Sequence, residues 1–216
     1  MIRSGAQKMS KTLGNVVDPF TLINEYSADA LRYFLTREIP FGEDGDFTHE
    51  RFSAVYEGSL AHGLGNLVSR VSAMIKKYFP DGIRRPSADL LTGVPLKRSP
   101  GGTLDGHWKD FSGRFELLME EVQITEAIRE LFEFYSMLDG YVQECEPFKL
   151  VVRDSETASV VLWNLAYHLL ESTRALEPFL PETSARIRRV FDFGSDGRIQ
   201  VSEQQALFPS AIKKTP

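Results

Sequence analysis

The chain has 216 residues, 42% of them hydrophobic and 25% charged, which excludes a wholly disordered protein. Its formal net charge of −5 excludes a global positive field that attracts nucleic acid, so any RNA contact needs a local patch. The single cysteine excludes an internal disulfide and favours a reducing compartment, from which we expect a cytoplasmic location. No apolar run reaches the roughly 18 residues of a membrane span, and the histidines are too scattered to predict a metal site. We therefore expect neither a membrane partner nor a bound metal.

The first 47 residues predict a loop followed by two short helices. Residues 1–17 read as loop. Asp18 as N-cap and Pro19 at the first helical position then predict the start of a helix that runs to about residue 26. A second helix is expected over 28–38. The proline and glycines of 39–47 predict a turn-rich link.

The longest periodic stretch extends from Phe52 to Phe79, where apolar residues recur in steps of three and four. It predicts one long amphipathic helix, which Thr48 begins and Pro80 ends. The buried stripe of this helix is expected to consist of Leu60, Leu64, Leu67, Val71, Met74 and Tyr78.

The second half of the chain predicts further helices after an irregular connection at 80–105. Residues 111–142 carry two helical patterns, which form either separate helices or one helix with a bend near Gln123. A last long helix is expected over 155–176 and a short basic helix over 185–191. A β-like segment follows at Arg198–Val201.

These elements predict an all-α fold, an antiparallel helix bundle of four to five main helices with a loop-rich N-terminal appendage. We place the appendage, a connecting segment that carries a lysine-rich loop, at residues 1–45. The helical bundle is expected to occupy residues 46–216.

The appendage contains Lys8-Met9-Ser10-Lys11-Thr12, followed by Gly14. Two lysines three apart, beside two hydroxyls and a glycine, are typical of a short loop that holds polyphosphate. Positioned cations of this kind stabilise the charge that develops on leaving phosphates. Such a loop needs a nucleotide pocket to close over, so the sequence predicts the back part of a larger enzyme.

Several segments carry a family resemblance. The stretch from Lys8 to Asn15 resembles the Lys-Met-Ser-Lys-Ser loop of class I aminoacyl-tRNA synthetases, with Thr12 in place of the usual serine. Residues 26–35 are similar to the subgroup that charges methionine, leucine, isoleucine, valine and cysteine. The segments that resemble the methionyl-tRNA synthetase family in particular are 37–47, 64–70 and 207–209. Ser27 and His62 depart from the family's usual glycine and asparagine.

The resemblance implies an enzyme that uses Mg-ATP to attach methionine to tRNA(Met). It assigns Lys8 and Lys11 to catalysis and Lys11 to ATP binding. The family's His-Ile-Gly-His-type motif and nucleotide-binding sheet do not occur in the sequence. We therefore expect the catalytic domain to be a partner, and the chain alone to bind no cofactor and to be inactive.

The resemblance also implies contacts with the CAU anticodon of tRNA(Met). Asn66 and Arg70 are an i,i+4 pair beside the predicted buried stripe. An amide can read a base edge, and a guanidinium can stack on a base or bind phosphate. Phe148 stands after Pro147 where the family commonly has tryptophan, and it is expected either to stack on a base or to pack into the core. No DNA partner is expected.

Two alternatives remain open. The chain could be a helical protein-interaction scaffold that docks on the catalytic half or on a tRNA-delivery partner. It could also be the equivalent domain of a valine- or leucine-type synthetase, although Asp44-Gly45-Asp46-Phe47 favours the methionine enzyme. The arginines at 186, 188 and 189 are expected to form a solvated helix face, and Trp108 and Trp163 are expected to pack.

Overall fold

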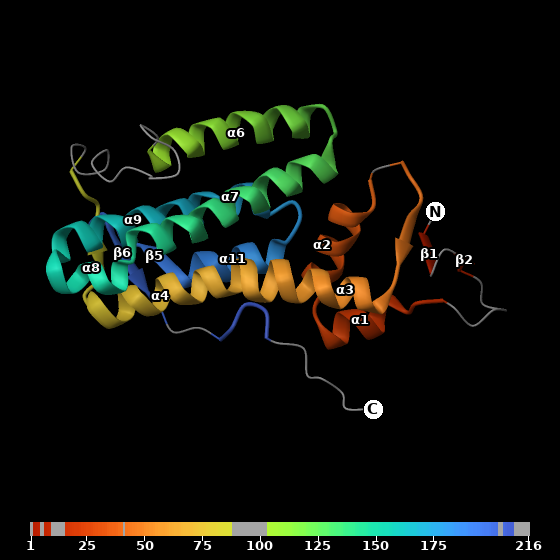
Figure 1. The fold of residues 1–216 in the computed structure, drawn as a ribbon, viewed down its shortest axis with the longest axis horizontal. Helices are drawn as coiled ribbons and strands as arrows, with labels where there is room; N and C mark the ends of the chain where they lie inside the picture. The colour runs from red at the N-terminus through yellow and green to blue at the C-terminus, as the bar shows by residue number, and fades with distance from the viewer. Residues whose placement is uncertain are drawn as a thin grey trace.

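The computed structural model describes residues 2–4, 7–9, 16–40, 42–87, 103–202 and 205–209. These residues are predominantly helical, as the sequence predicts, and their long helices lie side by side along the molecule (Figure 1). Two small three-stranded sheets lie at opposite ends of it. Only one of their strands was expected from the sequence.

Both N-terminal helices begin where their capping residues predict. Helix α1 (Pro19–Glu25) follows Asp18, whose carboxylate accepts a hydrogen bond from the Phe20 N–H at 3.1 Å. Helix α2 (Ala28–Glu38) follows Ser27, whose hydroxyl accepts from the Ala30 N–H at 3.1 Å. These side chains satisfy N–H groups that have no partner within the first helical turn.

The region 1–17, which we expected to be all loop, contains two short strands. Strand β1 (Ile2–Ser4) pairs antiparallel with β2 (Gln7–Lys8) and parallel with β3 (Gly45–Phe47). The Arg3 guanidinium also lies 2.7 Å from the Asp44 carboxylate. The pairing of β1 with β3 joins segments some forty residues apart and leaves no local sequence pattern, so this sheet was not predicted.

The predicted long helix is a continuous rod of three segments (Figure 1). Helix α3 (His49–Val55) is capped by the Thr48 hydroxyl, which accepts from the Arg51 N–H at 3.1 Å. A π-helical segment, η2 (Tyr56–Gly65), follows, and α4 (Asn66–Tyr78) completes the rod just before Pro80.

The π-helical segment follows from the spacing of the buried side chains. Phe52, Tyr56, Leu60, Leu64 and Val68 are all buried, each four residues after the last. In an α-helix of 3.6 residues per turn, each step of four overshoots a full turn by about 40°. The wider π turn offsets this drift, so the stripe stays on the core side of the rod.

The π-helical segment also rotates the helix that follows it, so the end of the predicted buried stripe is wrong. Met74 and Tyr78 are only half-buried, whereas Ser72 and Ile75 are buried in their place. The prediction assumed a constant α-helical period. It identified the buried residues correctly as far as Val71, but beyond Val71 it chose residues that lie beside the core face.

Helices α6 (Leu104–Glu120) and α7 (Ile124–Cys145) are separate and pack side by side (Figure 1). The chain reverses between them, and Val122 adopts φ 60° in that turn. The alternative of one bent helix over 111–142 is therefore wrong.

The chain then forms α8 (Pro147–Arg153), α9 (Ser155–Glu171), α10 (Thr173–Leu176) and α11 (Pro181–Val190). Helix α11 begins four residues before the expected 185–191, because proline at a first helical position starts a helix instead of breaking it. The second sheet has the order β4 (Ile83–Arg84), β6 (Arg198–Val201), β5 (Phe191–Phe193), with both pairs antiparallel. Of these strands, only β6 was predicted.

Residues 205–209 pack against the rod. The Tyr56 hydroxyl donates to the Pro209 carbonyl at 2.6 Å, and Arg186 donates to the carbonyls of Ala206 and Leu207, both at 2.7 Å. The expectation that Arg186 belongs to a solvated basic face is therefore wrong, since this side chain fastens the end of the chain. Trp163 is buried, as expected of a packing residue.

Candidate nucleic-acid interface

Asn66 lies at the point where the π-helical segment ends and α4 begins. Its backbone N–H bonds to the carbonyls of Ala61 and Gly63, and its side chain is exposed. The change of helical period therefore sets the side of the rod from which the Asn66 side chain projects. π-Helical segments are rare and are frequent at functional sites.

Arg70 follows Asn66 by one turn and is held by a carboxylate from another helix. Its Nη1 lies 2.7 Å from Oδ1 of Asp139 on α7, and the side chains of the two residues are 35% and 33% exposed. The Gln143 amide donates to the other carboxylate oxygen at 2.7 Å. The guanidinium has five N–H donors, so this contact leaves donors that an incoming ligand can reach.

Phe148 is the second residue of α8, a helix that contacts both α4 and α9. Its side chain is 44% exposed, so the alternative that it packs into the core is wrong. The ammonium of Lys149, which also forms an ion pair with Glu146 at 2.6 Å, lies 5.7 Å from the centre of the phenyl ring. Val152, one turn later on the same helix, is 85% exposed. Helix α8 thus carries an exposed apolar surface beside a cation.

Lys8, one of the two lysines of the predicted catalytic loop, is not brought to this face. Lys8 is the last residue of β2, at the other end of the molecule from α8 (Figure 1). Lys11 lies outside the described residues. Lys8 and the anticodon candidates therefore belong to different parts of the fold.

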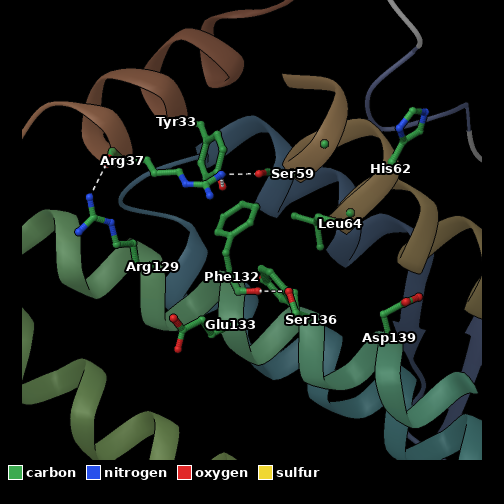
Figure 2. Close-up of a pocket in the computed structure, with 13 residues that line it drawn as sticks. Tyr33, Arg37, Ser59, His62, Leu64, Arg129, Phe132, Glu133, Ser136 and Asp139 are labelled. Carbon is green, nitrogen blue, oxygen red and sulfur yellow. Dashed lines mark hydrogen bonds between the residues drawn. The ribbon is translucent and has the colours of Figure 1, made fainter. Parts of the chain in front are cut away.

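An open groove of about 390 Å³ lies between η2 and α7, with α2 at one end (Figure 2). Asp139 lines it, so the groove is contiguous with the Arg70 ion pair. At the α2 end, the Arg37 guanidinium donates to the Tyr33 hydroxyl at 2.8 Å and to the Ser59 hydroxyl. Burial raises the pKa of the Tyr33 phenol above its ordinary value, and this outweighs the opposing effects of Ser59 and Arg37. The phenol therefore stays neutral.

The sequence did not predict Asp139 or the groove. Asp139 and Gln143 form an i,i+4 pair on α7, a signal that indicates a helix face but not the helix it meets. Among the described residues, no group of three His, Cys, Asp or Glu side chains could hold a metal ion. No helix in the same residues is both long and apolar enough to cross a membrane.

Comparison with known proteins shows which proteins the chain is similar to. Residues 1–72 match the model of the class I tRNA synthetases (M). The chain is 36% identical over 217 residues to the methionine–tRNA ligase of Clostridium acetobutylicum. This match covers 94% of this chain and 32% of that enzyme. It is 38% identical over 187 residues to the methionine–tRNA ligase of Bacillus subtilis. This match covers 83% of this chain and 26% of that enzyme.

The fold is also that of a solved structure. Mycobacterium tuberculosis methionyl-tRNA synthetase in complex with methionyl-adenylate superposes with a TM-score of 0.82 at 22% identity, over 96% of this chain and 42% of that one. The chain spans about a third of the length of the relatives it matches. The chain is thus similar over most of its length to methionine–tRNA ligases, and its residues 1–72 match the class I tRNA synthetase (M) model.

Proposed function

We propose that this chain is the tRNA-binding C-terminal part of a methionine–tRNA ligase, and that Asn66, Arg70 and Phe148 contact the CAU anticodon of tRNA(Met). Residues 46–216 would form the anticodon-binding bundle, and residues 1–45 would connect it to the catalytic domain. The observation that carries the proposal is the accessibility of Asn66 and Arg70 on one face of the rod, in a chain related to these enzymes over nearly its whole length.

The three side chains suit single-stranded RNA. The Asn66 amide offers a donor and an acceptor to a base edge, and Arg70 offers a planar fork to a base or phosphate. The phenyl ring of Phe148 offers a stacking face, a contact typically worth about 1–3 kcal/mol per base. Unpaired loop bases, whose edges are free, are the part of an RNA that such groups can read.

In the whole enzyme, Lys8 and Lys11 would stabilise the negative charge that develops on the phosphates of ATP as methionine is activated. Lys11 is the stronger candidate for contact with ATP. We expect the chain by itself to catalyse no ATP–pyrophosphate exchange with methionine, because that reaction needs the catalytic domain. Measurable exchange by the purified chain would refute this expectation.

Substitution of Arg70 tests the RNA contact. We expect Arg70→Ala to weaken binding of a CAU anticodon stem-loop at least several-fold, measured by fluorescence anisotropy of a labelled RNA, because a cation that reaches the RNA is lost. Arg114→Ala is the matched control. Arg114 on α6 also forms an ion pair with α7, 3.2 Å from Glu130, but lies outside the proposed face. Equal affinities of the wild type and Arg70→Ala would argue against the proposal.

A docking role beside RNA binding is favoured by exposed apolar side chains near α1. Phe20 is 72% exposed and Val16 is 47% exposed. We propose that these two side chains contact the catalytic domain. If the chain were only a scaffold, gel filtration would show no shift on addition of a CAU stem-loop.

A further inference from the structure

The groove between η2 and α7 is not used by the three proposed anticodon contacts. Gly58 and Gly63 leave part of the rod side of the groove without side chains, beside Ser59, His62 and Leu64. The half-buried Phe132 lines the groove from α7. The Phe132 ring packs on Tyr33, with ring centres 4.3 Å apart. These residues leave a shallow space with one apolar wall, which has room for a flat or ring-shaped group.

The polar side chains of the groove are divided between its ends. Arg37 and Arg129 lie at the α2 end (Figure 2). The Arg129 side chain is 51% exposed, and its nearest contacts are long: 3.3 Å to the Arg37 carbonyl and 3.8 Å to Glu126. Guanidinium groups with donors to spare bind phosphate well, because their planar fork matches its oxygens.

Acceptor groups follow along α7 in the direction of Arg70. Glu133, Ser136 and Asp139 lie on successive turns and line the groove. A carboxylate repels phosphate but accepts a hydrogen bond from a hydroxyl. The 2′-hydroxyl of RNA is such a donor, and it distinguishes RNA from DNA. The order of charges along the groove therefore fits a ribose next to a phosphate better than it fits an isolated phosphate.

The groove is contiguous with the proposed anticodon face. Asp139 lines the groove and also holds Arg70. Ser59, at the α2 end, and Arg70 are separated by at most about 16 to 17 Å along the rod at ~1.5 Å per residue, a distance that a few nucleotides span. One RNA strand can therefore occupy both places.

We propose that this groove binds a ribose-phosphate unit of the same RNA strand whose bases meet Asn66 and Arg70. This inference rests on the proposed function. Arg37 and Arg129 contact the phosphate, Glu133 and Ser136 accept from the ribose hydroxyl, and the sugar lies over Gly58 and Gly63.

Filling the groove tests the inference. A Cβ added at Gly58 meets no neighbouring heavy atom within 4 Å, so Gly58→Leu projects a side chain into the groove without a clash at the first carbon. Gly113→Leu is the matched control, since Gly113 is also exposed and helical and has no neighbour within 4 Å. We expect Gly58→Leu to weaken binding of a CAU stem-loop about five- to ten-fold and Gly113→Leu to leave it unchanged.

Two further measurements separate the possible results. A stem-loop with 2′-deoxy nucleotides in its loop should bind the wild type less tightly than the all-RNA form, and Gly58→Leu should reduce this difference. Arg129→Gln, a change at an exposed side chain that keeps the fold, should lower the slope of log affinity against log salt concentration by about one. The Arg129 variant decides the question if Gly58→Leu does not fold.

The inference would be overturned if Gly58→Leu folded and bound like the wild type, or if the salt slope of Arg129→Gln were unchanged, while Arg70→Ala still weakened binding. That result would leave the proposed function standing, and a protein ligand would then be the better occupant of the groove. Absence of any CAU stem-loop binding by the wild type would overturn both.

Discussion

Arg70 and Asp139 illustrate what one ion pair does at a surface. Both side chains are about one-third exposed, so the pair adds little to the free energy of folding. Its geometric effect is larger, because Asp139, itself bound by Gln143, fixes where the guanidinium lies. A fixed guanidinium presents its remaining donors in one direction, which is the property that a site for a base edge requires.

Phe148 allows a test that separates stacking from general apolar contact. We expect Phe148→Ala to weaken binding of the CAU stem-loop, by at most about 1–3 kcal/mol, and Phe148→Trp to bind at least as tightly as the wild type, because a larger ring stacks better. The measurement is an anisotropy titration of each variant.

Phe193→Ala is the control for this experiment. Phe193 in β5 is 45% exposed, against 44% for Phe148, but it lines a pocket with Arg174 and Arg188 instead of standing on α8. A loss of affinity in both alanine variants would point to a non-specific effect, and no loss in Phe148→Ala would remove this ring from the site.

The sequence predicted the positions of some of these side chains better than others. Asn66 and Arg70 were placed beside the core stripe because apolar spacing fixes the phase of a helix, and both are accessible in the structure. The exposure of Phe148 remained open, since a proline-aromatic pair at a helix start suits both core and surface. Asp139 was not predicted, because its partner lies on a helix 69 residues away in the chain.

The π-helical segment determines how the rod presents its surface. Without this segment, buried residues spaced four apart would drift around the helix, and Asn66 would point in a different direction relative to the core. Gly65, the last residue of the segment, permits the close approach of the C-terminal residues. A Cβ at this position would lie 2.9 Å from the Leu60 carbonyl oxygen and 3.4 Å from the Phe208 ring.

We predict that Gly65→Ala destabilises the protein by about 1–3 kcal/mol, the range typical of overpacking, although alanine is the better helix former. The cause is the backbone oxygen of Leu60, which cannot move aside as a flexible side chain could. Gly113→Ala, which meets nothing within 4 Å, should instead stabilise it by about 0.5–1 kcal/mol. Thermal or urea unfolding of both variants measures the difference, and a stabilised Gly65→Ala would contradict the packing described for the segment.

Helices and strands differed in how far the sequence predicted them. The capping residues Asp18 and Thr48 allowed the starts of α1 and α3 to be predicted closely. The start of α6 was predicted too late, at 111 instead of Leu104, and α7 has no side-chain cap. The π-helical segment was missed because a single constant period was assumed. Strands β1, β3 and β4 depend on partners distant in the chain. Strand β5 pairs with its neighbour β6, but runs of two or three residues carry no alternation to detect.

The net charge of −5 means that RNA binding by this chain has to be a local property. No long-range attraction is expected to bring the RNA to the protein, because the molecule as a whole repels a polyanion. The arginines at 37, 70 and 129 supply positive charge along one face, and Asp139 offsets part of it. The affinity should therefore fall as salt rises, with a slope set by the few phosphates contacted.

The measurement that decides the account is ultraviolet crosslinking of a CAU stem-loop to the intact chain, followed by mass spectrometry of the crosslinked peptides. We predict that anticodon nucleotides crosslink to peptides that contain Asn66, Arg70 or Phe148. Crosslinks confined to other surfaces, such as that of α11, with the anticodon nucleotides unmodified, would contradict this prediction.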